Sequence, residues 1–123
     1  MRALIVDDSR FIRDFIGGLL KTLQIDSSQA ADGCEALTML NSGAQFDFAL
    51  VDVNMPMMNG LDLVRQVRQK DTFSKMKLMM VTTEADTAIV SKALELGADE
   101  FLMKPFSEDS LRRKLGIMGF VEN

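Results

Sequence analysis

Four short runs of apolar residues recur along this chain, and each run ends on a polar residue. The runs cover residues 3–6, 48–51, 78–81 and 101–103. Because they are short, rich in branched side chains and free of polar residues, they predict strands that are buried on both faces of a parallel sheet. A fifth segment, 28–31, is weakly polar and therefore predicts a strand at the edge of that sheet.

Segments with helical periodicity separate the predicted strands. Residues 9–23 carry a wide apolar stripe, and Gly17 and Gly18 are expected on the opposite face of this helix. The stripe consists of Phe11, Ile12, Phe15, Ile16, Leu19, Leu20 and Leu23. A second helix is expected after the capping residue Asp32, and a third after Gly60.

The C-terminal third of the chain adds two more helices. Asp86 or Thr87 can cap the fourth, and Ser107 can cap the fifth. The residues expected on the buried side of the fourth helix are Ile89, Val90, Ala93 and Leu94. Those expected in solvent on the fifth helix are Arg112, Arg113 and Lys114. Because strand and helix alternate five times, we expect an α/β fold in one domain, residues 1–123, with helices on both faces of a parallel sheet.

Composition excludes several classes of function. A net charge of −4 argues against a nucleic-acid-binding protein, and no apolar stretch is long enough to enter a membrane. The single cysteine, Cys34, has no partner for an internal disulfide, and with no recognisable leader this predicts a cytoplasmic protein. The chain contains no histidine, so any chemistry that needs an imidazole must take it from a partner.

The polar residues at the strand ends are the candidate site. Asp7 and Asp8 follow the first strand, while Asp52, Thr82 and Lys104 stand at or after the ends of the others. In open α/β sheets the carboxyl ends of the strands form the ligand-binding edge. Three carboxylates, a hydroxyl and an ammonium group would meet there, which predicts a site for a divalent cation and a phosphoryl group.

Each of these residues has an ordinary explanation when taken alone, since Asp8 or Ser9 can simply cap the first helix. Together they are harder to explain. Two unit charges about 4 Å apart repel by on the order of 4 kcal/mol at intermediate dielectric, so a fold keeps such a cluster when a cation or a function requires it. A cation site that has only a few protein ligands, all of them oxygen atoms, favours magnesium over calcium.

Four motifs in this order resemble the receiver domain of two-component response regulators. They are the acid pair in 6–9 (VDDS), the pattern acid-x-x-Met-Pro-x-Met-x-Gly in 52–60, the hydroxyl residue Thr82, and Lys-Pro-Phe in 104–106. The resemblance covers essentially the whole chain and is strongest to the stand-alone, CheY-like regulators. It implies a flavodoxin-like three-layer sandwich with five helices and strand order 2-1-3-4-5.

The resemblance also assigns roles. Asp52 would accept a phosphoryl group from a phosphohistidine on a sensor histidine kinase. Mg²⁺ would be bound by Asp8, Asp52 and the backbone carbonyl of Asn54, with Asp7 acting directly or through water. Lys104 would contact one phosphoryl oxygen.

A second group of residues would form the switch and tune it. Thr82 would donate to the phosphoryl group, and the ring of Phe101 would move in response, although it lacks the hydroxyl of the tyrosine found in well-known chemotaxis regulators. The peptide before Pro105 resembles the family's cis peptide. Asn54 and Glu84 resemble the pair found in regulators with short-lived phosphoryl groups, which implies self-hydrolysis within seconds to minutes.

The expected output is binding of a downstream protein by the face of the fourth helix, fifth strand and fifth helix. A flagellar motor switch is one candidate, a phosphatase is a further partner that the resemblance admits, and the protein is expected to be a monomer that turns over no external substrate. A phosphorelay intermediate, or a receiver cut from a longer regulator, remains an alternative. A true phosphohydrolase is less favoured, because Asn54 stands where such enzymes usually carry a second acid.

Overall fold

Five parallel strands form the central sheet of the computed structural model, which describes residues 1–55, 57–83 and 87–122. The strands are β1 (Arg2–Val6), β2 (Asp26–Ala30), β3 (Phe48–Asp52), β4 (Lys77–Thr82) and β5 (Glu100–Met103). Their order in the sheet is β2-β1-β3-β4-β5, so the predicted order is confirmed.

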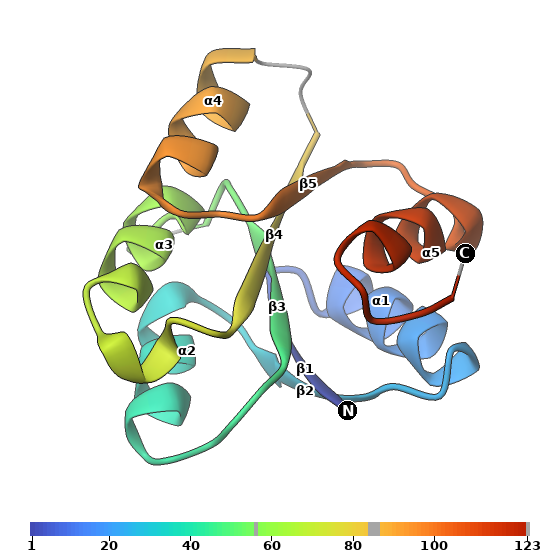
Figure 1. Ribbon diagram of the computed structural model, residues 1–123, viewed down its shortest axis with the longest axis horizontal. Coiled ribbons are helices and arrows are strands. Elements are labelled where there is room, and N and C mark those ends of the chain that lie inside the picture. Colours follow the sequence, from blue (N-terminus) through green and yellow to red (C-terminus); the bar gives the residue numbers. More distant parts are fainter. Residues whose placement is uncertain (56, 84–86, 123) are drawn as a thin grey trace.

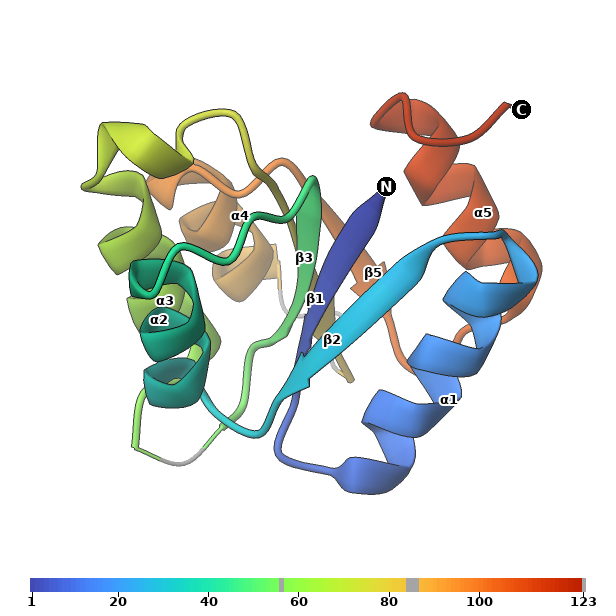
Figure 2. The ribbon, with the colours of Figure 1, turned by 90° about the horizontal axis from the view of Figure 1, so that it is seen from below.

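Helices cover both faces of this sheet. They are α1 (Arg10–Thr22), α2 (Gly33–Asn41), α3 (Gly60–Arg68), α4 (Thr87–Leu96) and α5 (Glu108–Ile117), with a 3-10 turn, η1 (Asp71–Phe73), after α3. Figure 1 shows the alternation along the chain, and Figure 2 shows α1 and α5 on one face of the sheet and α2, α3 and α4 on the other. The predicted three-layer sandwich is therefore confirmed.

The core is divided by the sheet because successive side chains of a strand point to opposite faces. In β1, Ala3 and Ile5 pack with the buried residues of α1 and α5, while Leu4 and Val6 pack with those of α2 and α3. All five residues of β3 are buried, as expected for a strand between two neighbours and two helical layers. The long apolar runs in the sequence thus mark the strands at the centre of the sheet.

The edge strand β2 begins two residues earlier than predicted, at Asp26, and ends at Ala30. Its start is set by pairing with β1, where Arg2 lies opposite Asp26. Asp26 is exposed and the next three residues are only partly buried, which an edge position tolerates. Local sequence did not reveal these first two residues because they carry no apolar signal.

The apolar stripe of α1 is narrower than predicted. Ile16 and Leu20 are buried, but Phe11 is 78% exposed and Phe15 is 43% exposed. Gly17 was expected on the solvent face, and this was wrong: a Cβ there would lie 3.5 Å from Ser27 Oγ on β2. The helix packs on the sheet through one side only, so the stripe turns toward solvent at its N-terminal end.

Two predicted caps of the other helices are confirmed. Asp32 and Ser107 cap α2 and α5 through side-chain hydrogen bonds, Ser9 rather than Asp8 caps α1, and Asn59, which the sequence analysis did not single out, caps α3. In α4, Ala93 is buried as expected, but Leu94 is 44% exposed and its predicted burial was wrong. None of the helices in the described ranges is long and apolar enough to cross a membrane.

At the amino end of the sheet, Arg68 of α3 joins several segments. Its guanidinium donates to the backbone carbonyls of Gly97 (2.9 Å), Phe73 (2.9 Å) and Met76 (2.7 Å). It also pairs with the Asp99 carboxylate at 2.9 Å. Asp99 in turn accepts the N–H of Leu78 in β4 at 2.8 Å. This set of contacts, the Arg68 cluster, fixes the ends of α3 and α4 to the starts of β4 and β5.

Candidate functional site

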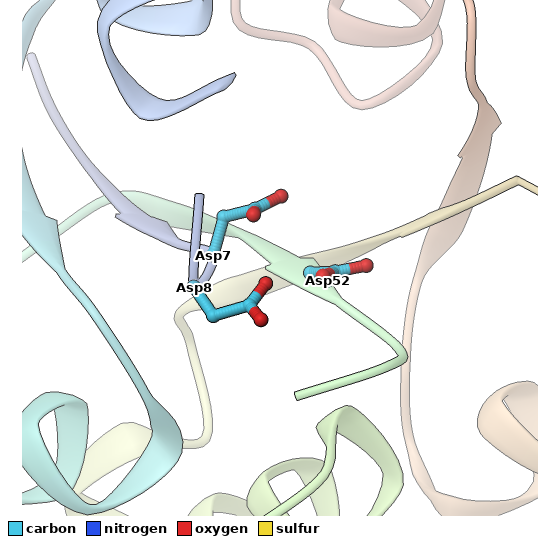
Figure 3. A group of neighbouring side chains, drawn as sticks. All are labelled: Asp7, Asp8 and Asp52. Carbon is cyan, nitrogen blue, oxygen red and sulfur yellow. The ribbon is translucent and has the colours of Figure 1, made fainter. Parts of the chain in front are cut away.

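The carboxyl ends of the neighbouring strands β1 and β3 bring three carboxylates together. Asp7 and Asp8 directly follow β1, and Asp52 is the last residue of β3. One oxygen of each carboxylate lies within 4.8 Å of the others. Figure 3 shows the three groups gathered at this edge of the sheet. The predicted cluster therefore exists, and its oxygen donors are those that hard divalent cations prefer.

Asp7 is held more firmly than Asp8. Its side chain is buried, and its two carboxylate oxygens accept from the Ser9 backbone N–H and the Lys104 ammonium group, both at 2.9 Å. Its backbone carbonyl accepts from the Arg13 guanidinium at 2.7 Å. Asp8 is exposed. Asp8 is therefore open to a ligand from solvent, whereas both carboxylate oxygens of Asp7 already have a partner.

The Asp52 carboxylate lies in the least favourable position for a charge. Burial and, after it, the negative charge of Asp7 raise the pKa of Asp52 from 3.8 to about 6, although Lys104 and the N–H of Asn54 act to lower it. Asp8 adds a smaller repulsion. The distances are 3.5 Å to Lys104 Nζ and 3.4 Å to the Asn54 nitrogen. A carboxylate with too little compensating charge is one that a cation would stabilise.

Lys104, the residue directly after β5, brings a positive charge to the site. Its ammonium group bridges Asp7 and Asp52, and its side chain is only 16% exposed. The Lys104 backbone N–H donates to the Thr82 carbonyl at 2.7 Å, which continues the pairing of β4 and β5 beyond the last strand residues. The peptide between Lys104 and Pro105 is cis, so this prediction is confirmed.

Thr82 and Phe101, the two predicted switch residues, lie on these same strands. Thr82 ends β4 and is buried, and Phe101 of β5 is half-buried. The Lys114 ammonium group lies 4.3 Å from the centre of the Phe101 ring and 3.0 Å from a Glu100 carboxylate oxygen. Lys114 was expected in solvent, and this was wrong because the ring and the carboxylate give its charge two partners.

Gly60 allows α3 to begin directly under the site. A Cβ at this position would lie 2.5 Å from the Asp52 carbonyl oxygen and 2.9 Å from the Val53 Cα. The Gly60 N–H donates to the Val53 carbonyl at 2.9 Å, so the start of α3 lies against the end of β3. Only glycine permits this approach. The glycine that ends the motif in 52–60 is therefore needed for a steric reason.

An apolar groove of about 480 Å³ opens beside the carboxylates. It is lined by Phe11, Ile12, Phe15, Thr83, Lys104, Pro105 and Phe106. The centres of the Phe15 and Phe106 rings lie 5.9 Å apart, and the Phe11 side chain is largely exposed. Sequence reasoning missed this groove because it assigned both α1 aromatics to the core. The unusual width of the apolar stripe was the available signal.

Sequence reasoning also missed Arg13. It stands three and seven residues before the buried Ile16 and Leu20, so it lies on the side of α1 that faces the sheet. A charged residue at a buried helical position was the signal in the sequence. Two other predictions, the tuning role of Glu84 and capping by Asp86, lie outside the described residues.

Comparisons with known proteins agree with this geometry. The family model described as "Response regulator receiver domain" matches residues 3–116. Chemotaxis protein CheY1 of Helicobacter pylori is 39% identical over 119 residues, which is 96% of each chain. Chemotaxis protein CheY of Pseudomonas aeruginosa is 40% identical over 116 residues, covering 94% of this chain and 93% of that protein. The solved structure of CheY4 from Vibrio cholerae matches with a TM-score of 0.88 and 34% identity, over 94% of this chain and 96% of that one.

Proposed function

This chain belongs to the response regulator receiver domain family, of the CheY type in two-component signalling, and we propose that Asp52 is its phosphoacceptor. The single observation that carries the proposal is the position of Asp52: buried, beside two further carboxylates, and within 3.5 Å of the Lys104 ammonium group. A raised pKa near 6 leaves Asp52 mostly ionised at neutral pH and therefore nucleophilic.

In the proposed reaction, a carboxylate oxygen of Asp52 forms a bond to the phosphorus of a phosphohistidine while the P–N bond breaks. The electron pair of that bond returns to the imidazole. This chain has no histidine, so the imidazole belongs to another protein, for which we propose a sensor histidine kinase. Mg²⁺, held by Asp8, Asp52 and the carbonyl of Asn54, would balance charge on the phosphoryl oxygens. Asp7 orients Lys104, which would balance the remaining charge.

Phosphorylation would then change the charge that Lys104 and Thr82 face. The aspartyl phosphate adds negative charge at the end of β3, next to the end of β4 where Thr82 lies. We infer that the Thr82 hydroxyl donates to it and that Phe101 follows, so that α4, β5 and α5 present a different surface to a downstream protein. The named relatives are chemotaxis proteins, which favours a chemotaxis-like output.

The apolar groove beside the site gives the phosphodonor a surface to lie against. Lys104 contacts the carboxylates and also lines the groove, so a protein that delivers a phosphoryl group to Asp52 would pass over Phe11. A large, exposed aromatic side chain next to the charged side chains of a candidate site is typical of a binding surface. We assign this groove to the histidine kinase.

The protein is proposed to act only on itself. A phosphohydrolase would need a group that gives a proton to a leaving alcohol, and Asn54 cannot do this at the position where such enzymes carry an acid. A phosphorelay intermediate uses the same site residues and is distinguished by transfer of the label onward to a second histidine protein.

The test is phosphotransfer from a radiolabelled histidine kinase. Asp52→Asn should abolish labelling, whereas Asp109→Asn, which removes an exposed carboxylate from the first turn of α5, should leave it unchanged. Circular dichroism of both variants would verify the fold. Stoichiometric labelling of Asp52→Asn would overturn the assignment.

A further inference from the structure

Arg13 connects the start of α1 to the peptide that carries the acid pair. Its Nη1 donates to the backbone carbonyl of Asp7 at 2.7 Å, and its Nε donates to the Gln29 side-chain oxygen at 3.0 Å. The Gln29 amide then donates to the Asp14 carboxylate, also at 3.0 Å. One guanidinium therefore ties α1, the edge strand β2 and the turn after β1 together.

In this arrangement a polar residue of the edge strand β2, Gln29, has a structural role. Gln29 is partly buried, and its oxygen orients the guanidinium so that a second N–H reaches Asp7. Helix electrostatics do not explain the arginine, because a cation in the first turn of a helix is disfavoured by the helix dipole. The planar fork of arginine, with donors in fixed directions, does explain it.

We propose that Arg13 is a positioning residue for the cation site, in that it fixes the Asp7–Asp8 peptide and thereby aims the Asp8 carboxylate at Asp52. The inference rests on the proposed function, which assigns a cation to these carboxylates. The carbonyl that Arg13 holds belongs to the peptide bond between Asp7 and Asp8. With Arg13 in place, the turn that carries Asp7 and Asp8 is ordered before the cation binds. Cation binding therefore does not pay the entropy cost of ordering it.

A purely electrostatic role for Arg13 predicts the opposite effect. Removing a positive charge near three carboxylates makes the site more negative, which would strengthen the binding of Mg²⁺. Removing a positioning contact loosens the turn and weakens binding. The direction of the change therefore distinguishes the two roles, whatever its size.

Three variants separate these effects. Arg13→Met removes the charge and both hydrogen bonds, while Gln29→Met keeps the charge and removes the group that orients it. Arg10→Met is the matched control, because Arg10 carries the same charge one turn earlier on α1 but is 86% exposed and pairs only loosely with Asp14 at 3.7 Å.

The readout is titration of each unphosphorylated protein with Mg²⁺, followed by the amide NMR signals of Asp8 and Asn54, since the chain has no tryptophan or tyrosine for fluorescence. We expect about tenfold weaker binding for Arg13→Met, at the lower end of what loss of a partner behind a metal ligand costs. Gln29→Met should weaken binding by a smaller factor, and Arg10→Met should leave it unchanged or slightly stronger.

A second readout needs no metal. The Ser9 N–H donates to the Asp7 carboxylate, so its hydrogen exchange in metal-free protein reports the order of the turn. It should exchange faster in Arg13→Met than in Arg10→Met. Unchanged or tighter Mg²⁺ binding by folded Arg13→Met and Gln29→Met would overturn the positioning role alone. Absence of Mg²⁺ binding by the unmodified protein would overturn the metal site of the proposed function and this inference with it.

Discussion

The two ends of the sheet each carry a group of charged side chains, and the two groups are balanced differently. At the amino end, the Arg68 guanidinium has an ion pair and three backbone carbonyls as partners. At the carboxyl end, the carboxylates of Asp7, Asp8 and Asp52 lie together, and the ammonium group of Lys104 pairs with two of them, Asp7 and Asp52. The chain satisfies the first group by itself, whereas the second is left with an excess of negative charge.

This difference separates a structural ion cluster from a functional one. A partly buried ion pair with all its hydrogen bonds made holds segments together, and removing one partner leaves the others unpaired. An unbalanced cluster instead costs folding free energy, which an external cation can recover. The following predictions test this contrast, beginning with the largest expected effect on free energy.

Arg68→Met should destabilise the protein by about 4 kcal/mol, because it leaves three backbone carbonyls without their donor and removes the nearest cation from Asp99, which keeps the Leu78 N–H and the more distant Lys77. The matched control is Arg65→Met on the same helix, whose exposed ion pair with Asp62 should be worth less than about 1 kcal/mol. Urea unfolding followed by circular dichroism measures both. Equal losses for the two variants would mean that the Arg68 cluster does not organise the amino end.

Asp52→Asn should have the opposite sign and stabilise the metal-free protein at pH 7 by about 3 kcal/mol, at about 1.4 kcal/mol for each pKa unit. The pKa of Asp52 is raised from 3.8 to about 6 in the folded state, so the folded protein binds a proton more tightly than the unfolded chain. The cost of ionised Asp52 is therefore absent below about pH 4, appears as pH rises, and is complete above pH 6.

The measurement is the free energy of unfolding of both proteins between pH 4 and pH 8 in the presence of a chelator. The stabilisation should be present at pH 7 and should vanish toward pH 4. Asp71→Asn, which alters an exposed carboxylate on η1, is the control and should change little at any pH. A destabilised Asp52→Asn at pH 7 would contradict an unbalanced site.

The affinity for Mg²⁺ should depend on the protonation of the Asp52 carboxylate. Because proton and cation compete for the Asp52 carboxylate, apparent affinity should fall by up to about tenfold per pH unit below pH 6, and level off above it. Amide NMR titrations at several pH values between 5 and 8 measure this. Equal affinities at pH 5 and pH 7.5 would mean that Asp52 is not among the ligands.

The smallest effect is expected at the groove. Phe11→Ser should slow phosphotransfer from the kinase by about fivefold, because it removes exposed apolar area that a partner would cover. The same variant should react normally with a small-molecule phosphodonor, which does not need that surface. Ile117→Ser at the end of α5, also exposed, is the control and should leave both reactions unchanged. If Phe11→Ser behaved like the control, the histidine kinase would not bind at the groove.

Much of the fold and the candidate site was predictable because the informative signals are local. Fully apolar runs such as 48–51 are typical of buried parallel strands, and the acidic residues at their ends had to meet once those strands were parallel neighbours. The glycine in the motif around Asp52 has a steric explanation, because only glycine fits where α3 approaches the end of β3.

What failed to follow from local sequence depends on which surfaces meet. Phe11 and Ile16 belong to one apolar stripe, yet one is exposed and the other buried, because α1 contacts the sheet along part of its surface only. Gly17 faces β2 for the same reason. The polar residues Arg13 and Gln29 are sixteen positions apart in the chain, and only the packing of α1 against β2 brings them to 3.0 Å.

The sequence by itself determined the order of strands and helices, the family, and the identity of the charged groups at the carboxyl edge. The tertiary structure alone decided how strongly those groups interact: Asp7 engaged and buried, Asp8 exposed, Asp52 with a pKa near 6, and Lys104 between two carboxylates. The physical reason is that residue types are fixed along the chain, whereas electrostatic energies depend on distance and desolvation, which only the packed chain sets.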